Sequence, residues 1–205
     1  MADDQSPVKA RRPGGRSARV RAAVLEATLV ELVEKGYAGL SVDGVATRSG
    51  VHRTSIYRRW SNREALLVAA LESPDLLMDH PPDTGSFDDD LRIYSESAVE
   101  VLNGPPGAVL RALLVSEASS LESVARVIRN GFLTLRSSSL PMVERAMVAG
   151  AVPVKTDAVD VMDHLLAPIY FRFLRSDEPV DVAVATQGAA ATVVAARAGV
   201  FVRDR

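Results

Sequence analysis

The sequence predicts an all-α protein in which a three-helix helix-turn-helix head is joined through a fourth helix to a larger helical body. Three observations support this fold class. Apolar residues recur at spacings of three and four over most of the chain, which is typical of amphipathic helices. No stretch alternates between apolar and polar residues for long enough to indicate a sheet. Glycine and proline separate the periodic segments, as they do at helix ends.

The composition narrows the class of protein. The 205 residues suffice for one sizeable core, or for a small domain joined to a larger one. There is no cysteine, which excludes disulfides and cysteine-rich zinc sites. No apolar run reaches the roughly 18 residues of a membrane-spanning helix. Residues 1–21 lack the apolar stretch of a secretory signal. We therefore expect a cytoplasmic protein that does not contact a membrane.

Charge is distributed unevenly along the chain, although the formal net charge is only −2. Residues 1–63 contain 12 Lys and Arg against 6 Asp and Glu, whereas residues 64–205 contain 12 against 20. A head of +6 on a body of −8 indicates that the head contacts a polyanion. A chance segregation of solvated surface charge is the alternative, and charge alone does not exclude it.

The head is expected to occupy residues 17–76, after an arm over residues 1–16 whose Pro, Gly, Ser and charged residues predict disorder. Ser41 is a favourable N-cap for the second helix of the head. Ser61 and Glu64 match a capping box for the fourth helix. The predicted helices cover residues 17–36, 41–50 and 53–60, and the fourth begins after Ser61 and ends before Pro74.

The body is expected to occupy residues 77–205, after a seam at residues 80–86. Asp157 suits an N-cap, and Pro179 suits the first turn of the last helix. The predicted helices cover residues 87–102, 109–117, 121–137, 141–149, 157–174 and 179–198. The third and fourth of these form either one long helix or two.

Residues 41–60 have the pattern of a helix-turn-helix, with the turn at Gly50. Ile56 and Trp60 are four residues apart and are predicted to face the core, which turns Thr54 and Arg58 outward. The outer face then presents small hydroxyls, an aromatic hydroxyl and guanidinium groups. This is the chemistry of a helix that enters the major groove of DNA. The alternative is three packed helices with a solvated, arginine-rich face.

The predicted DNA-binding residues divide by position. Arg53, Thr54 and Ser55, at the start of the third helix, are expected to meet base edges. The others are expected to hold phosphate groups, which fix the register of the protein on DNA without reading sequence. These are Ser41, His52, Tyr57, Arg58, Arg59 and Arg63. For His52 the alternative is a simple helix cap, and for the basic arm it is either a minor-groove contact or a solvated tail.

Residues 21–71, from "RAAVLEATLV" to "NREALLVAAL", resemble the N-terminal domain of TetR-family transcriptional regulators. The matching features are "EKGY" at the end of the first helix, "LSVDGVATRSGV" over the second helix and the turn, and the block "TSIYRRWSNREALL". The sequence departs from the family pattern at Glu31, usually an apolar position, and at His52, often a small polar one. Residues 140–194 resemble one class of the family's ligand-binding and dimerisation domains.

The resemblance implies a sequence-specific DNA-binding transcriptional regulator, most often a repressor that a small molecule releases from its operator. It implies a homodimer formed through the last two helices, on a partly palindromic double-stranded DNA operator. It also implies a small apolar or amphipathic ligand in the body and no cofactor. Residues that are conceivable as pocket lining, and equally as plain core, are Tyr94, Phe132, Leu135, Met162, Leu166 and Tyr170.

Two other classes of function fit the sequence less well. A helical adaptor, or a ligand-binding protein without a DNA function, leaves the +6 head unexplained. A helical enzyme lacks support, because the chain has no phosphate-binding glycine loop, no nucleophile motif and no zinc motif, so no catalytic residue is predicted. Asp160 and His164 share a helix face, but two ligands are too few for a metal site, and none is predicted.

Overall fold

The computed structural model describes residues 15–73 and 81–203. Most of the predicted disordered arm over residues 1–16, and the first residue of the predicted seam, lie outside these ranges. Within them the chain is helical, as predicted, and the pairing of extended backbone is limited to an isolated antiparallel bridge between Thr156 and Val202. None of the helices in the described part combines the length and the apolar character needed to cross a membrane.

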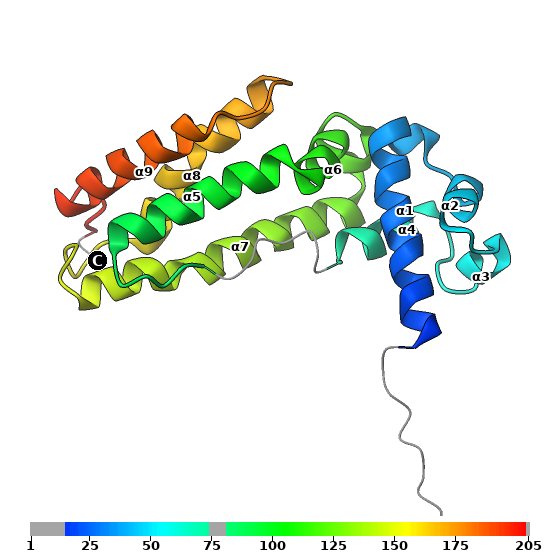
Figure 1. Cartoon of the computed structure of the whole chain (residues 1–205), viewed down its shortest axis with the longest axis horizontal. Coiled ribbons are helices and arrows are strands. Elements are labelled where there is room, and N and C mark those ends of the chain that lie inside the picture. Colours follow the sequence, from blue (N-terminus) through cyan, green and yellow to red (C-terminus); the bar gives the residue numbers. More distant parts are fainter. Residues whose placement is uncertain (1–14, 74–80, 204–205) are drawn as a thin grey trace, which may run out of the picture.

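The molecule consists of a small head and an elongated body (Figure 1). The head contains α1 (Arg16–Gly39), α2 (Val42–Ser49), α3 (Arg53–Tyr57) and α4 (Arg63–Leu71). The body contains α5 (Phe87–Asn103), α6 (Pro105–Leu114), the 3-10 helix η2 (Glu117–Ser120), α7 (Glu122–Val148), α8 (Ala158–Arg175) and α9 (Val182–Arg197). Helix α1 lies across the end of the body, and α8 and α9 pack side by side along it (Figure 1).

Glycine interrupts the first helix of the head and ends the second at the predicted positions, although α1 continues to Gly39. Gly36 has φ 66° and ψ 176°, which interrupts α1 and lets Tyr37 and Leu40 turn into the core. The hydroxyl of Ser41 accepts a hydrogen bond from the amide of Gly44 at 3.1 Å, as expected of an N-cap. Gly50 then ends α2 with φ 67° and ψ 17°, a left-handed conformation that suits glycine.

The predicted capping box of Ser61 and Glu64 is wrong. The N-cap of α4 is Asn62, whose side chain accepts from the amide of Ala65 at 2.8 Å. Asparagine caps as well as serine does, and here it lies one residue nearer to the start of the helix. The carboxylate of Glu64 instead accepts a hydrogen bond from the hydroxyl of Ser123 on α7, which joins the head to the body.

Four body and head segments differ from the predicted boundaries. Helix α3 ends at Tyr57, not at residue 60, because the amides of Arg59 and Trp60 both donate to the carbonyl of Ile56 in a tight turn. Helix α6 begins at Pro105, since proline needs no amide donor in a first turn.

The segments predicted over residues 121–149 form the single helix α7, which continues through Pro141. Burial of the neighbouring Met142 and Val143 in the body core offsets the hydrogen bond that proline cannot donate. Helix α9 begins at Val182, later than predicted, because Asn103 exchanges two hydrogen bonds of 2.8 and 2.9 Å with the backbone of Val180 and keeps that residue out of the helix.

The apolar core of the head is continuous with part of the body. Leu25, Leu32, Ile56 and Leu66 belong to the same buried cluster as four residues of α6, η2 and α7. Those four are Val109, Leu113, Ala118 and Val124. The orientation of the head is therefore set by apolar packing on α6 and on the start of α7.

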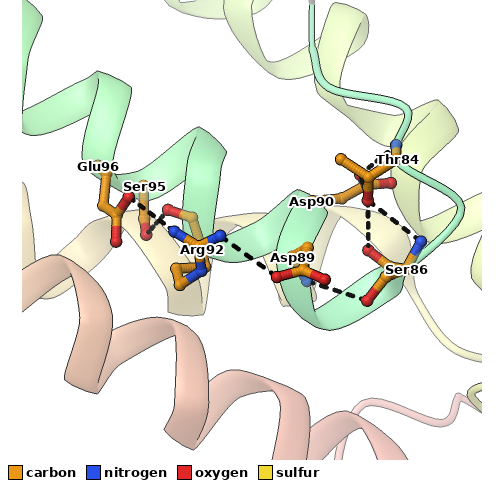
Figure 2. Close-up of polar contacts among 7 residues, drawn as sticks. All are labelled: Thr84, Ser86, Asp89, Asp90, Arg92, Ser95 and Glu96. Carbon is orange, nitrogen blue, oxygen red and sulfur yellow. Dashed lines mark hydrogen bonds and ion pairs between the residues drawn. The ribbon is translucent and has the colours of Figure 1, made fainter.

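Asp90, near the start of α5, holds the segment before this helix in place. Its buried carboxylate accepts from the amide and the hydroxyl of Thr84 at 2.8 and 2.7 Å, and from Arg145 of α7 at 3.3 Å. Ser86 caps the helix through the amide of Asp89 (Figure 2). The segment over residues 81–86 is thus fixed to both α5 and α7.

Candidate nucleic-acid interface and body cavity

The core side of the helix-turn-helix has the predicted residues. Ile56 is fully buried and Trp60 is 9% exposed, as the four-residue spacing requires. Val45 of α2 is also fully buried in the same cluster. Helices α2 and α3 are therefore held at a fixed angle, with the opposite face of α3 in solvent.

The solvent side of α3 presents a cationic and hydroxyl-bearing surface. His52, Arg53, Thr54, Tyr57 and Arg58 are exposed. Ser55 is half-buried, so it is less available than predicted. Arg53 lies 3.6 Å from Asp43 of α2, with both side chains about two-thirds exposed, and such a pair is weak in water. The guanidinium of Arg53 can exchange this partner for a base or a phosphate at little cost.

Arg59 already has a partner within the protein. Its guanidinium donates to the hydroxyl of Ser17 at 2.6 Å, at the beginning of α1. Ser17 and Arg21 line the same surface hollow as Arg59 and Trp60. This contact brings the start of α1, with Arg21, next to the helix-turn-helix, a juxtaposition that no local motif in the sequence indicates.

Arg63 also has an intramolecular role that was not predicted. Its guanidinium lies 4.3 Å from the centre of the Tyr37 ring and donates to the carbonyl of Tyr37 at 3.3 Å. Half-buried, it packs α4 against the end of α1. Ser41, a further predicted contact, uses its hydroxyl to cap α2. The structure therefore exposes most of the predicted residues, whereas Arg63 and Ser41 also make contacts within the head.

Glu31, the departure from the family pattern, is an ion-pair centre. Its side chain is only 2% exposed, and its carboxylate accepts from Lys35 at 2.7 Å and from Arg48 of α2 at 3.1 Å. Arg48 also pairs with Glu34. The hydrogen bond from Lys35, aided by that from Arg48, lowers the pKa of Glu31 in spite of its burial. This network holds α2, and with it the helix-turn-helix, against α1.

The body contains an apolar cavity of about 150 Å³ between α5, α6 and α7. Leu71 of α4 forms part of its wall, so the cavity borders the head. A second recess of about 560 Å³, whose lining includes the charged residues Arg129, Arg136 and Asp163, shares three lining residues with it. These are Phe132, Leu135 and Tyr170, which were conceivable lining residues from the sequence.

The other three conceivable lining residues are placed differently. Met162 and Leu166 line only the second recess. Tyr94 lines neither space and is buried in the body core, where desolvation raises the pKa of its hydroxyl. The cavity could not be assembled from the sequence, because its walls come from helices far apart along the chain.

Asp160 and His164 do not converge on a common point. Asp160 pairs with Arg203 at 2.5 Å, and a ring nitrogen of His164 lies 2.9 Å from the hydroxyl of Thr192 on α9. The described residues contain no group of three His, Cys, Asp or Glu side chains arranged to hold a metal ion.

Helices α8 and α9 leave large apolar side chains in solvent. Phe171 and Leu174 of α8 are each more than three-fifths exposed, and Val182 and Val194 of α9 are more than half exposed. These exposed apolar side chains make the two packed helices a candidate interaction surface.

Comparison with known protein families matches both parts of the chain. Residues 24–70 match the family described as bacterial regulatory proteins, tetR family. Residues 81–192 match the tetracyclin repressor-like C-terminal domain. The two matches correspond to the head and to most of the body.

Individual relatives agree with the family matches. The HTH-type transcriptional regulator AqdR of Rhodococcus erythropolis is 33% identical over 167 residues, which is 80% of each chain. The DNA-binding transcriptional repressor TetR of Mycobacteroides abscessus is 42% identical over 71 residues, 34% of this chain and 37% of the other. The crystal structure of the TetR family transcription regulator SCO0332 superimposes with a TM-score of 0.61 at 30% identity, covering 86% of this chain and 97% of the other.

Proposed function

The chain belongs to the TetR family of transcriptional regulators, and from that we propose that it is a homodimeric repressor which leaves a partly palindromic operator when a small molecule occupies its body. It is a DNA-binding transcriptional regulator and not an enzyme. The observation that carries the proposal is the exposed cationic face of α3, held rigidly on a packed head that is continuous with a cavity-bearing body.

In the proposed complex, α3 lies in the major groove. Arg53 and Thr54, at its N-terminal end, contact base edges, while Tyr57 and Arg58 bind phosphates. Arg59 contacts Ser17 through one edge of its guanidinium, and its remaining N–H donors are available to the DNA backbone. We further propose that Ser55 contacts a base edge and that Ser41 and His52 contact phosphates.

Dimerisation is proposed to occur through α8 and α9. Their exposed apolar side chains would be buried against the same surface of a second subunit related by a two-fold axis. Such a dimer would place two copies of α3 about one turn of DNA, roughly 34 Å, apart. An operator with two half-sites at that spacing matches this symmetry.

Release from DNA is proposed to begin at the body cavity. Because Leu71 of α4 is part of its wall, a molecule that fills the cavity bears directly on the head. The molecule must bind the conformation that does not fit DNA more tightly than the one that does, since a ligand with equal affinity for both shifts nothing. The effector is thus expected to lower operator affinity.

The decisive experiment is selection of bound duplexes from random DNA with the full-length protein, followed by a salt titration on the recovered site. We expect a partly palindromic consensus and a log–log slope near −0.9 for each phosphate contact. Recovery of no consensus, together with a flat salt response, would contradict the proposed function.

A further inference from the structure

We propose that the cavity between α5, α6 and α7 binds a neutral, compact, mainly apolar molecule with one hydrogen-bond acceptor, that Tyr170 donates to this acceptor, and that Gly131 keeps the space for it. The regulatory meaning of this inference rests on the proposed function. The binding itself does not, because it concerns the body and can be measured without DNA.

The chemistry of the wall selects a neutral ligand. The side chains that line the cavity are hydrocarbon, with the phenol of Tyr170 as the one polar group among the described residues. Burying an ionised group there without a partner would be very unfavourable. The volume of about 150 Å³ is of the size that accepts a benzene ring in an apolar interior. A single ring with a small substituent therefore fits in size and in polarity.

Tyr170 supplies one directional contact. Its hydroxyl forms no hydrogen bond with any described residue, whereas the hydroxyl of Tyr94 donates to the carbonyl of Leu135 at 3.5 Å. Burial raises the pKa of Tyr170 to about 12, so the phenol stays protonated near neutral pH and can donate. The Phe132 ring packs edge-on against it, with centroids 5.6 Å apart, which restricts the phenol. A carbonyl or hydroxyl oxygen of the ligand would satisfy this donor.

Gly131 of α7 also indicates space for a ligand. It lies in the interior of α7, where glycine is less stable than alanine. A Cβ atom built on Gly131 would meet no heavy atom within 4 Å, so packing of the chain does not require glycine there. Gly107 shows the opposite case, because a Cβ atom there would lie 1.8 Å from the carbonyl oxygen of Leu102. Gly131 lines the cavity, and the absence of a side chain at this position leaves part of the cavity open.

The adjoining recess could favour a different class of ligand, an anionic one. It shares Phe132, Leu135 and Tyr170 with the cavity but is also lined by Arg129 and Arg136. A carboxylate could reach these cations from the cavity. Both arginines are exposed to water, and Arg129 already pairs with Glu122 at 2.8 Å. They therefore attract an anion weakly, and the cavity wall favours the neutral molecule.

The test uses three molecules of nearly the same shape with the full-length protein in calorimetric titrations without DNA. Acetophenone is neutral and carries a carbonyl acceptor, isopropylbenzene lacks the acceptor, and benzoate is anionic. We expect acetophenone to bind several-fold more tightly than isopropylbenzene, and benzoate to bind at least about tenfold more weakly than acetophenone. In Tyr170→Phe, the affinity for acetophenone should fall to that for isopropylbenzene, and the affinity for isopropylbenzene should be unchanged.

Variants at Gly131 test whether the cavity space beside this residue is needed for binding. Gly131→Leu should abolish binding of both neutral molecules, and Gly131→Ala should weaken it partly while raising the thermal unfolding temperature. Ser137→Leu adds the same side chain at an exposed position of α7 and should bind like the unmodified protein. The alanine variant keeps the test valid if the leucine variant does not fold.

Three results would overturn the inference: no binding of either neutral molecule, tighter binding of benzoate, or unchanged binding in both Gly131 variants. Tighter binding of benzoate would place the ligand on the arginines of the recess. Operator binding measured on the same preparation reports separately on the proposed function, so a protein that binds DNA but none of the neutral probes disproves only the ligand class.

Discussion

The guanidinium Nε of Arg48 on α2 lies 3.1 Å from a carboxylate oxygen of Glu31 on α1, and it joins the two helices through a buried acid. The position that departs from the family pattern is therefore occupied by a charge with two cationic partners. Breaking such a pair from one side leaves a buried charge without compensation, which is far more unfavourable than losing an exposed pair.

Replacing Glu31 with glutamine is expected to destabilise the head by about 1–3 kcal/mol at pH 7, because Arg48 loses a charged acceptor while remaining partly hydrated. The measurement is chemical denaturation, read through Trp60 fluorescence. An equal free energy of unfolding for both proteins at pH 7 would show that the pair contributes nothing.

The stabilisation by Glu31 should depend on pH in a defined direction. Its pKa is lowered in the folded protein from an ordinary value of 4.5, so its contribution is complete above about 4.5 and is lost as the pH falls through the folded pKa. The difference in unfolding free energy between the parent protein and Glu31→Gln should therefore shrink below pH 4.5. A difference that stays constant from pH 7 to pH 3 would contradict this.

Gly44→Ala should destabilise the head although alanine favours helices. A Cβ atom at Gly44 would lie 2.4 Å from a carboxylate oxygen of Glu31, which is buried and cannot easily move. In the background of Glu31→Ala the same change should be neutral or stabilising by up to about 1 kcal/mol. A double-mutant cycle measures this coupling, and strict additivity of the two changes would disprove the steric explanation.

Arg53→Ala and Arg58→Ala should weaken operator binding in different ways. Arg53→Ala is expected to relax preference at one base pair, at about 1–3 kcal/mol. Arg58→Ala should weaken binding to all sequences alike and lower the salt slope by about 0.9. Binding measured on a panel of single-base operator variants distinguishes them, and two indistinguishable profiles would refute the assignment.

Arg63→Ala should reduce stability as well as DNA affinity, because the guanidinium packs on Tyr37 and binds its carbonyl. We expect a loss of about 1–2 kcal/mol in unfolding free energy. Arg58→Ala is the matched control, since Arg58 is exposed and has no partner among the described residues. Equal thermal stability of the two variants would argue against the structural role of Arg63.

Phe171→Glu should convert the proposed dimer to monomer, since Phe171 is 63% exposed in the single chain and lies on the proposed interface. Light scattering after size exclusion gives the mass directly. Val115→Glu, at an apolar position at the end of α6 that is even more exposed, should leave the dimer intact. If Phe171→Glu remained dimeric, the interface would lie elsewhere.

Local patterns predicted much of the fold and the exposed face of the head. The spacing of Ile56 and Trp60 sufficed to orient α3, because a short amphipathic helix has only one apolar side. Local patterns could not decide between Ser61 and Asn62 as the cap of α4, since both are good caps and they are one residue apart. The path of α7 through Pro141 was equally undecided, because it depends on burial by other helices.

Contacts between distant segments were beyond any local pattern. The hydrogen bond between Arg59 and Ser17 joins residues 42 positions apart, and it gives an internal partner to a cation that the sequence predicts to bind phosphate. The role of Gly131 became visible only once the cavity and its walls were in place, because the sequence around it reads as an ordinary helix.

The sharing of one apolar cluster by the head and by α6, η2 and α7 makes the head unsuitable for excision. A fragment cut after α4 would lose Val109, Leu113 and Val124 from this cluster and would expose the apolar surface of α1 and α4 that packs on α6 and α7. A chimaera that gives this protein the operator preference of a relative should therefore exchange α6 and the first turns of α7 together with the head, or graft only the outward side chains of α3.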